Sequence, residues 1–125
     1  MLKKFLPVLF LPLLLAGCAT HYTNLTPQQQ PRSTNNLYLV EVAVASSQQT
    51  LRWGSIRPQI VVGDKFYDMH PTLLMTNRWE GLVPVPPGTT SISYRYKFDY
   101  EFNAMGKPKS GSRISSEYTL RVKEQ

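Results

Sequence analysis

The sequence contains a single cysteine and only two histidines in 125 residues. One cysteine excludes an intramolecular disulfide framework and a zinc site built from cysteines. The G-x-S-x-G elbow of the hydrolases and the glycine loop that cradles phosphates are both missing. Aromatic residues make up 11% of the chain, which excludes a wholly disordered protein. The composition therefore indicates one small folded domain.

Positive charge is in slight excess, with 14 Lys and Arg against 8 Asp and Glu. These cations are spread along the chain, so the balance does not indicate a nucleic-acid partner. We expect neither a nucleic acid nor a cofactor to bind.

The longest apolar run is too short to remain in a bilayer as a helix. It extends from Phe5 to Ala16, whereas a span needs about 20 residues. Because Lys3 and Lys4 precede it, residues 1–17 have the pattern of a cleaved signal peptide.

The residues Leu15-Ala16-Gly17-Cys18 end this run. They resemble the lipobox of bacterial lipoproteins, in which small residues precede an obligatory cysteine. The resemblance implies that Cys18 receives a diacylglycerol, becomes the first residue after cleavage, and is acylated on its amino group, typically with palmitate. Two or more acyl chains hold a protein stably on a membrane, whereas one holds it only marginally. An ordinary signal peptide is the alternative, and it would leave an unpaired thiol in an oxidising compartment.

Ala19 follows the lipobox cysteine. In Gram-negative lipoproteins an aspartate at this position is associated with retention at the inner membrane. The resemblance therefore implies a bacterial envelope protein that faces the periplasm or the cell exterior, sorted to the outer membrane if the organism has one.

Residues 18–36 are rich in Gln, Asn, Thr and Pro and show no period of 2 or 3.6. We predict that they form a flexible tether that begins at the lipidated Cys18. Fully extended, this tether would let the domain stand about 60 Å from the membrane.

From Leu37 onward, apolar and polar residues alternate as they do in β-strands. The predicted strands cover 37–45, 51–53, a hairpin over 57–69 that turns at Gly63-Asp64, 79–85, 91–102 and 114–122. In 91–102 six aromatic or aliphatic residues occupy alternate positions, so we predict that this strand is the spine of the core. Its outer tyrosines are expected to be half-exposed, and residues 103–111 are expected to form a loop.

About seven strands with regularly spaced turn signals predict an all-β, antiparallel sandwich over residues 37–125. In size and strand count it resembles immunoglobulin-like and fibronectin-III-like domains, without the cysteine pair of antibody domains. A small open barrel is the alternative.

The catalytic and metal-binding candidates are few. Asp68 and His70 would share a face of one strand, and with Glu80 they could hold a metal or act as an acid–base dyad. A solvated strand end before Pro71 is the preferred interpretation. Asp99 and Glu101 alternate with cations, which favours a solvated sheet face of mixed charge over a glycosidase pair. We therefore predict a protein that is not an enzyme and holds no metal.

The candidate binding surface combines tryptophan, arginine and lysine, the first two being common in binding hot spots. Its residues are Arg52, Trp53, Arg78, Lys107 and Lys109. Trp79 is expected in the core, which would turn Arg78 outward, whereas Trp53 suits the core and the surface equally. Lys107 and Lys109 would form a positively charged tip that could contact an anionic surface or a protein partner.

These features favour a membrane-anchored, non-catalytic envelope lipoprotein that binds a protein partner or serves as an accessory subunit. A module that binds peptidoglycan or another polysaccharide is the alternative, and it requires Trp53 or a row of tyrosines to be exposed. A hydrolase would require His70 to lie in a pocket with Ser or Asp partners.

Overall fold

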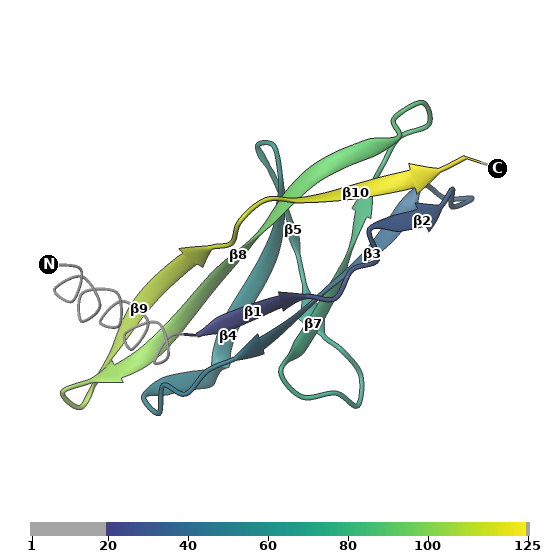
Figure 1. Cartoon of the computed structure of the whole chain (residues 1–125). Helices are drawn as coiled ribbons and strands as arrows, with labels where there is room; N and C mark the ends of the chain where they lie inside the picture. Colours follow the sequence, from purple (N-terminus) through teal and green to yellow (C-terminus); the bar gives the residue numbers. More distant parts are fainter. Residues whose placement is uncertain (1–19, 125) are drawn as a thin grey trace, which may run out of the picture.

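Residues 20–124 are described by a computed structural model, in which strands account for most of the chain (Figure 1). The strands are β1 (His21–Asn24), β2 (Gln29–Pro31), β3 (Leu37–Ala45), β4 (Leu51–Val62), β5 (Lys65–Asp68), β6 (His70–Pro71), β7 (Arg78–Pro84), β8 (Ser91–Ala104), β9 (Lys107–Ile114) and β10 (Tyr118–Lys123). Within this part of the chain, no helix has the length and hydropathy to cross a membrane. The predicted signal peptide, the lipobox and Cys18 lie outside the described residues.

The strands form two sheets that pack as a sandwich. One sheet has the order β1-β3-β7-β6, and the other has the order β2-β10-β8-β4-β5 with β9 also paired to β8. Neighbouring strands are antiparallel, apart from β2 and β10, which run parallel. This is the order of an immunoglobulin-like sandwich, with β1, β3, β7 and β6 in the places of its A, B, E and D strands. The predicted all-β sandwich is confirmed, and the two separate sheets exclude the open barrel.

The core lies between the sheets and centres on β3 and β8. Every second residue of β3 from Tyr38 to Val44 is buried, and alternate residues of β8 are buried from Tyr94 to Phe98. Tyr100 and Phe102 continue the same face and are half-buried. A large apolar side chain contributes about 1.5–3 kcal/mol when fully buried. The prediction that 91–102 is the spine of the core is therefore confirmed.

The predicted hairpin is also present, but its first strand is longer than expected. β4 and β5 meet at a turn where Gly63 has a φ of 61°, as the first position of a type II′ turn requires. The short strand predicted at 51–53 is continuous with this hairpin, because β4 runs along β8 through a register shift between Arg52 and Arg57.

The prediction of a flexible tether is wrong for residues 20–36. β1 pairs with β3, and β2 pairs with β10. The Tyr22 ring stacks on Phe98 of the opposite sheet, with the ring centroids 4.2 Å apart. The polar side chain of Asn24 is held by the Tyr94 and Tyr96 hydroxyls. The segment is polar because it forms edge strands, and its partners lie far away in the sequence.

The predicted loop at 103–111 is wrong in most of its length. A tight turn at Met105 and Gly106 joins β8 to β9, and Lys107 already pairs with Ala104. The single strand predicted at 114–122 is divided into the end of β9 and β10. Across this break Ser115 keeps the ladder intact, because its N–H donates to the Tyr96 carbonyl and its Oγ accepts from the Tyr96 N–H, both at 2.9 Å.

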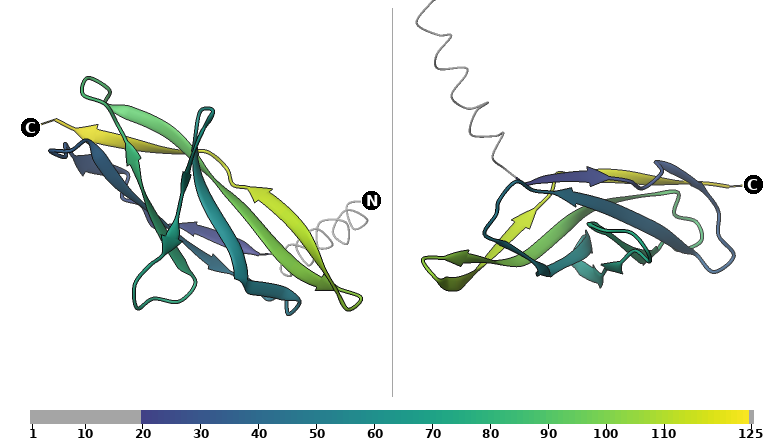
Figure 2. Two further views of the ribbon diagram at one scale, coloured as in Figure 1. Left: turned by 180° about the vertical axis from the view of Figure 1, so that it is seen from behind. Right: turned by 90° about the horizontal axis from the view of Figure 1, so that it is seen from below.

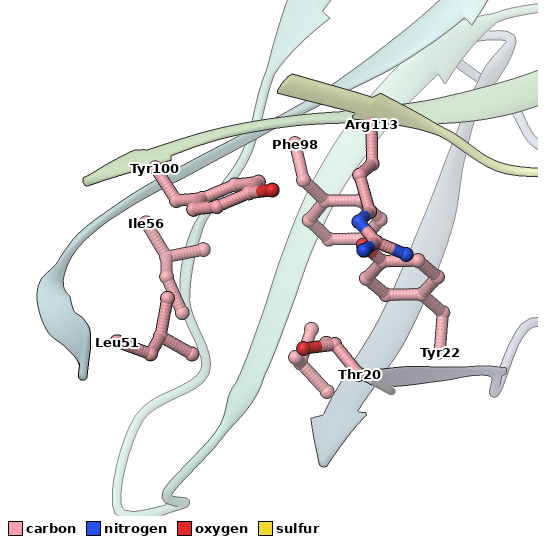
Figure 3. Close-up of a pocket in the computed structure, with 8 residues that line it drawn as sticks. Thr20, Tyr22, Leu51, Ile56, Phe98, Tyr100 and Arg113 are labelled. Atoms are coloured by element: carbon pink, nitrogen blue, oxygen red, sulfur yellow. The ribbon is translucent and has the colours of Figure 1, made fainter. Parts of the chain in front are cut away.

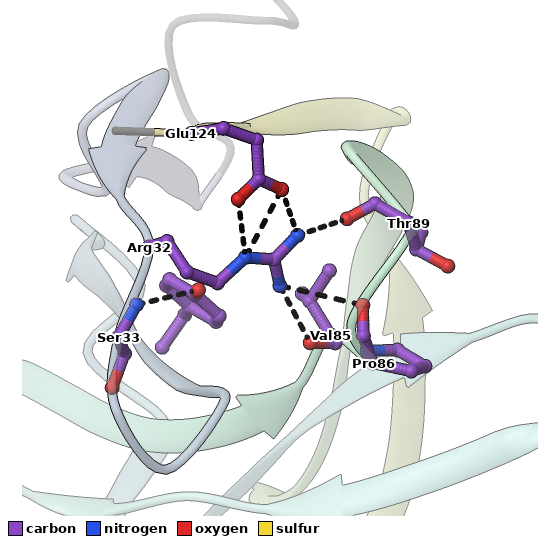
Figure 4. A network of polar contacts seen from close by, with 7 residues as sticks. Arg32, Ser33, Val85, Pro86, Thr89 and Glu124 are labelled. Atoms are coloured by element: carbon purple, nitrogen blue, oxygen red, sulfur yellow. Dashed lines mark hydrogen bonds and ion pairs between the residues drawn. The ribbon is translucent and has the colours of Figure 1, made fainter.

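One arginine fastens the end of the sandwich that carries the C-terminal residues (Figure 4). The Arg32 guanidinium pairs with Glu124 and donates to the carbonyls of Val85, Pro86 and Thr89. It thereby ties β2, the loop between β7 and β8 and the end of β10 together. This ion pair lowers the pKa of Glu124 and raises that of Arg32.

The opposite end of the sandwich, called the proximal end below, is where the described chain begins. It consists of Thr20 and the connections over residues 46–50, 72–77 and 105–106. Backbone hydrogen bonds join two of these connections to neighbouring strands: Val44 N–H of β3 donates to the Asn77 carbonyl and Asn103 N–H of β8 donates to the Thr50 carbonyl, both at 2.9 Å. In the views of Figures 1 and 2 the β8–β9 hairpin projects on the side where β1 starts.

Candidate functional site

Three of the five predicted binding residues lie at the proximal end, but on two different faces of the second sheet. Arg52 of β4 is opposite Glu101 of β8, and Lys109 of β9 is opposite Phe102. Lys107 lies two residues closer to the hairpin turn, on the same face as Lys109. The Arg52 Nη1 is 3.1 Å from the Glu101 Oε1 on the outward face of the sheet. Lys107 and Lys109 share the opposite face with Phe102, so they do not form one surface with Arg52.

The other two predicted binding residues lie elsewhere in the domain. Trp53 is half-buried and packs against the core. Arg78 lies in the other sheet, where its Nη2 is 3.6 Å from the Glu41 Oε2. Trp79, next to Arg78, is buried as predicted. The two tryptophans therefore do not form an exposed aromatic platform.

The Asp68–His70 pair is separated by the fold. Asp68 ends β5 in one sheet, and His70 begins β6 in the other. The Asp68 carboxylate accepts from the Gln59 Nε2 at 2.8 Å, while the exposed His70 has its Nε2 3.9 Å from the Glu80 Oε2. No group of three His, Cys, Asp or Glu within residues 20–124 is placed to hold a metal ion.

The predicted mixed-charge face of β8 is present. Lys97 Nζ is 3.3 Å from the Asp99 Oδ2, and Arg95 Nη2 is 3.7 Å from the Glu117 Oε2. Carboxylates on this face are thus paired with cations, as in an ordinary solvated sheet surface.

A small cavity opens between the sheets near the proximal end (Figure 3). Its walls include Tyr22, Phe98, Tyr100 and Arg113. Burial raises the pKa of Tyr22, and the Tyr100 side chain raises that of Arg113 through a hydrogen bond. The cavity volume is about 20 Å³, which accommodates a water molecule. It is too small for an organic ligand.

A larger depression crosses the outer face of the second sheet. We call it the outer groove and define it by Val61, Phe66, Arg95, Lys97, Ile114 and Glu117. Its volume is about 410 Å³. Phe66 and Ile114 are 53% and 61% exposed, and the Lys97 Nζ lies 5.8 Å from the centre of the Phe66 ring. The groove thus combines exposed apolar side chains with flanking ion pairs.

Sequence reasoning missed the outer groove. Val61 is opposite both Phe66 and Arg95, and Ile114 is opposite Lys97, so all of them share the outward face. Within the predicted hairpin, Val61 and Phe66 break the rule that outward positions are polar. That exception was the available signal, but only the pairing of β8 with both β4 and β9 brings Ile114 next to them.

The proximal end also carries protruding apolar side chains. Leu73 and Leu74 are 85% and 95% exposed in the loop between β6 and β7, and Met105 is fully exposed at the β8–β9 turn. Among the large hydrophobic residues of the described chain, these three are the most exposed.

Comparison with known proteins adds only distant resemblances. No protein-family model and no curated protein matches the chain. Two similar solved structures are a DUF4785 family protein from Legionella pneumophila and murine CRIg. The first has 8% identity and a TM-score of 0.43 over 82% of this chain and 28% of its own, so this chain spans less than a third of it. The second has 7% identity and a TM-score of 0.43 over 84% of this chain and 98% of its own.

Proposed function

We propose that this chain is a lipid-anchored protein of the bacterial envelope whose sandwich is a non-catalytic module for binding a protein partner. The acylated Cys18 would hold it on the membrane, by resemblance to the lipobox proteins. The outer groove would receive the partner.

The exposed pair Phe66 and Ile114 is the observation that carries the binding part of the proposal. Apolar side chains of this size on an outward sheet face lose contact with water when a partner covers them. The ion pairs Arg95–Glu117 and Lys97–Asp99 flank them, so the groove suits a segment that has an apolar side chain between polar groups. Immunoglobulin-like sandwiches also commonly serve as interaction modules rather than as enzymes.

The glycan-binding alternative is less well supported. It needs a flat aromatic surface beside polar groups, yet Trp79 is buried and Trp53 packs against the core. The tyrosines of β8 also face inward. The hydrolase alternative needs a pocket around His70, which is exposed on the surface instead.

The proposed protein partner is tested by comparing the proteins that co-purify with three variants from bacterial envelopes. The full lipidated protein, a Phe66→Ser/Ile114→Ser variant and a Leu82→Ser control would be purified in parallel from the cells that make them. Leu82 is half-exposed on the outer face of the other sheet. The control therefore replaces an exposed apolar side chain by serine, as the groove variant does, but outside the groove. We expect one protein to be recovered with the wild type and the control and lost with the groove variant. Equal recovery with all three, or retention on a polysaccharide column without a protein partner, would contradict the proposal.

The anchor is tested separately by fractionation. Cys18→Ser removes the thiol that would carry the lipid, so the variant should move from the membrane fraction to the soluble envelope fraction. If the variant stays with the membranes, the lipid is not what holds the protein there.

A further inference from the structure

The length of chain between the proposed lipid and the folded domain is much shorter than the sequence suggests. The described chain starts at Thr20, and β1 begins at His21. Only two peptide links separate Cys18 from Thr20, and they span about 7 Å at most. A lipidated Cys18 would therefore place the proximal end next to the head groups, rather than tens of ångströms above them.

The side chains at the proximal end suit such a position. Leu73, Leu74 and Met105 protrude there, and nothing in the described chain covers them. Leu74 also has a φ of 62°, a backbone conformation that a leucine rarely adopts. Exposed apolar tips on a soluble domain are typical of surfaces that meet a protein or a membrane.

The charges at this end fit the polar layer of an anionic bilayer. Lys107 and Lys109 follow the Met105 turn directly, whereas Arg52 lies two strands away on the other face of the sheet. Acidic residues are scarce at this end. Glu101 is the one acidic residue in the segments 20–24, 45–55, 72–77 and 101–111, and it is paired with Arg52. Lysines near a bilayer are attracted to anionic head groups, while apolar side chains enter the boundary with the acyl chains.

We infer that the proximal end is a second membrane contact, in which Met105 and the Leu73–Leu74 loop enter an anionic phospholipid surface and Lys107 and Lys109 bind its phosphates. This inference rests on the proposed lipid anchor. Together the two contacts would hold the long axis of the sandwich away from the bilayer and leave the outer groove open to a partner.

The test measures the depth of two hairpin turns in vesicles. The full lipidated protein would carry either Met105→Cys or the control Asp64→Cys, each labelled with an environment-sensitive fluorophore. Asp64 lies in the β4–β5 turn at the other end of β4, and acylation of Cys18 leaves the introduced thiol as the only free one. The vesicles would contain phosphatidylglycerol, with or without a nitroxide-labelled lipid as quencher.

We expect strong quenching and a blue-shifted emission at position 105 and neither effect at position 64. Leu74→Cys should behave like Met105→Cys, which covers the case that one variant folds poorly. Replacing Lys107 and Lys109 by Gln should reduce the quenching at position 105, as should high salt or vesicles of phosphatidylcholine alone.

Equal, weak quenching at positions 105 and 64 in protein that floats with the vesicles would overturn the inference and leave the anchor intact. Protein that fails to float and retains a free Cys18 thiol would instead refute the anchor. Quenching at position 105 that is unchanged by the lysine replacements, by high salt and by uncharged lipid would overturn the assignment of head-group binding.

Discussion

The Tyr96 hydroxyl lies 2.6 Å from the Oδ1 of Asn24, a residue 72 positions earlier in the chain. The same hydroxyl is 2.9 Å from the Glu41 carbonyl and 3.2 Å from the Thr26 Oγ1. This cluster joins the first strand to the centre of β8. It is the polar counterpart of the stacking between Tyr22 and Phe98, and it explains why the amino-terminal segment belongs to the domain.

Removing this hydroxyl should destabilise the protein. Tyr96→Phe leaves polar groups of Asn24 and Thr26 short of a partner in a buried site, a loss that costs about 1–3 kcal/mol. The free energy of unfolding from urea titrations measures it. Tyr118→Phe is the matched control, because Tyr118 is half-buried next to the Tyr96 ring and its hydroxyl can reach water. Equal losses in the two variants would contradict the importance of the cluster.

Burial also gives the protein a specific alkaline sensitivity. Desolvation is the main reason why the pKa of Tyr96 lies far above its usual value of 10. In the unfolded chain this tyrosine loses its proton above about pH 10, while in the folded protein it keeps it. Stability should therefore be full below pH 10 and should fall as the pH rises beyond it. Urea midpoints between about pH 9 and 11 should fall less steeply for Tyr96→Phe; parallel curves would contradict this assignment.

The opposite pH range tests the ion pair at the other end. Arg32 lowers the pKa of Glu124 below its usual value of 4.5. The unfolded chain binds the proton first as the pH falls, so the contribution of this pair is present above pH 4.5 and is lost in more acid solution. The Glu124 side chain of this pair is half-exposed to solvent, and we expect a small effect that salt reduces. Glu124→Gln should flatten the acid limb of the stability curve; an unchanged limb would mean that the pair contributes nothing.

Two glycines in the second sheet should respond oppositely to alanine. A Cβ on Gly111 would lie 2.6 Å from the Tyr100 Cζ, so Gly111→Ala must displace that ring and should cost about 1–3 kcal/mol. A Cβ on Gly54 would meet no atom within 4 Å, and Gly54→Ala should be neutral or slightly stabilising. Thermal unfolding of both variants measures the difference, and equal melting temperatures would show that Tyr100 does not pack against Gly111.

The parts of the fold that the sequence predicted are those with an apolar face in a central strand. In β3 and β8 the period of 2 is uninterrupted, because both strands have a neighbour on either side and one face in the core. The Gly63 turn was predicted for a local reason as well, since its positive φ favours glycine.

The parts that could not be predicted depend on distant contacts. Asn24 and Thr26 are polar residues in contact with the core, and only the fold reveals the tyrosine hydroxyls that satisfy them. β9 was missed because the hairpin extends past the core, so its inward positions hold Lys107 and Lys109 rather than apolar residues. Arg52 faces outward opposite Glu101, so the fold places it on the other side of the sheet from these lysines, which local spacing does not reveal.

The intact mass of the mature protein, extracted from envelopes with detergent, tests the central claim most directly. The account predicts a chain that begins at Cys18 and carries a diacylglycerol and an amide-linked acyl group, attached two residues before the sandwich starts. A chain of unmodified mass with a free thiol at Cys18 would contradict it.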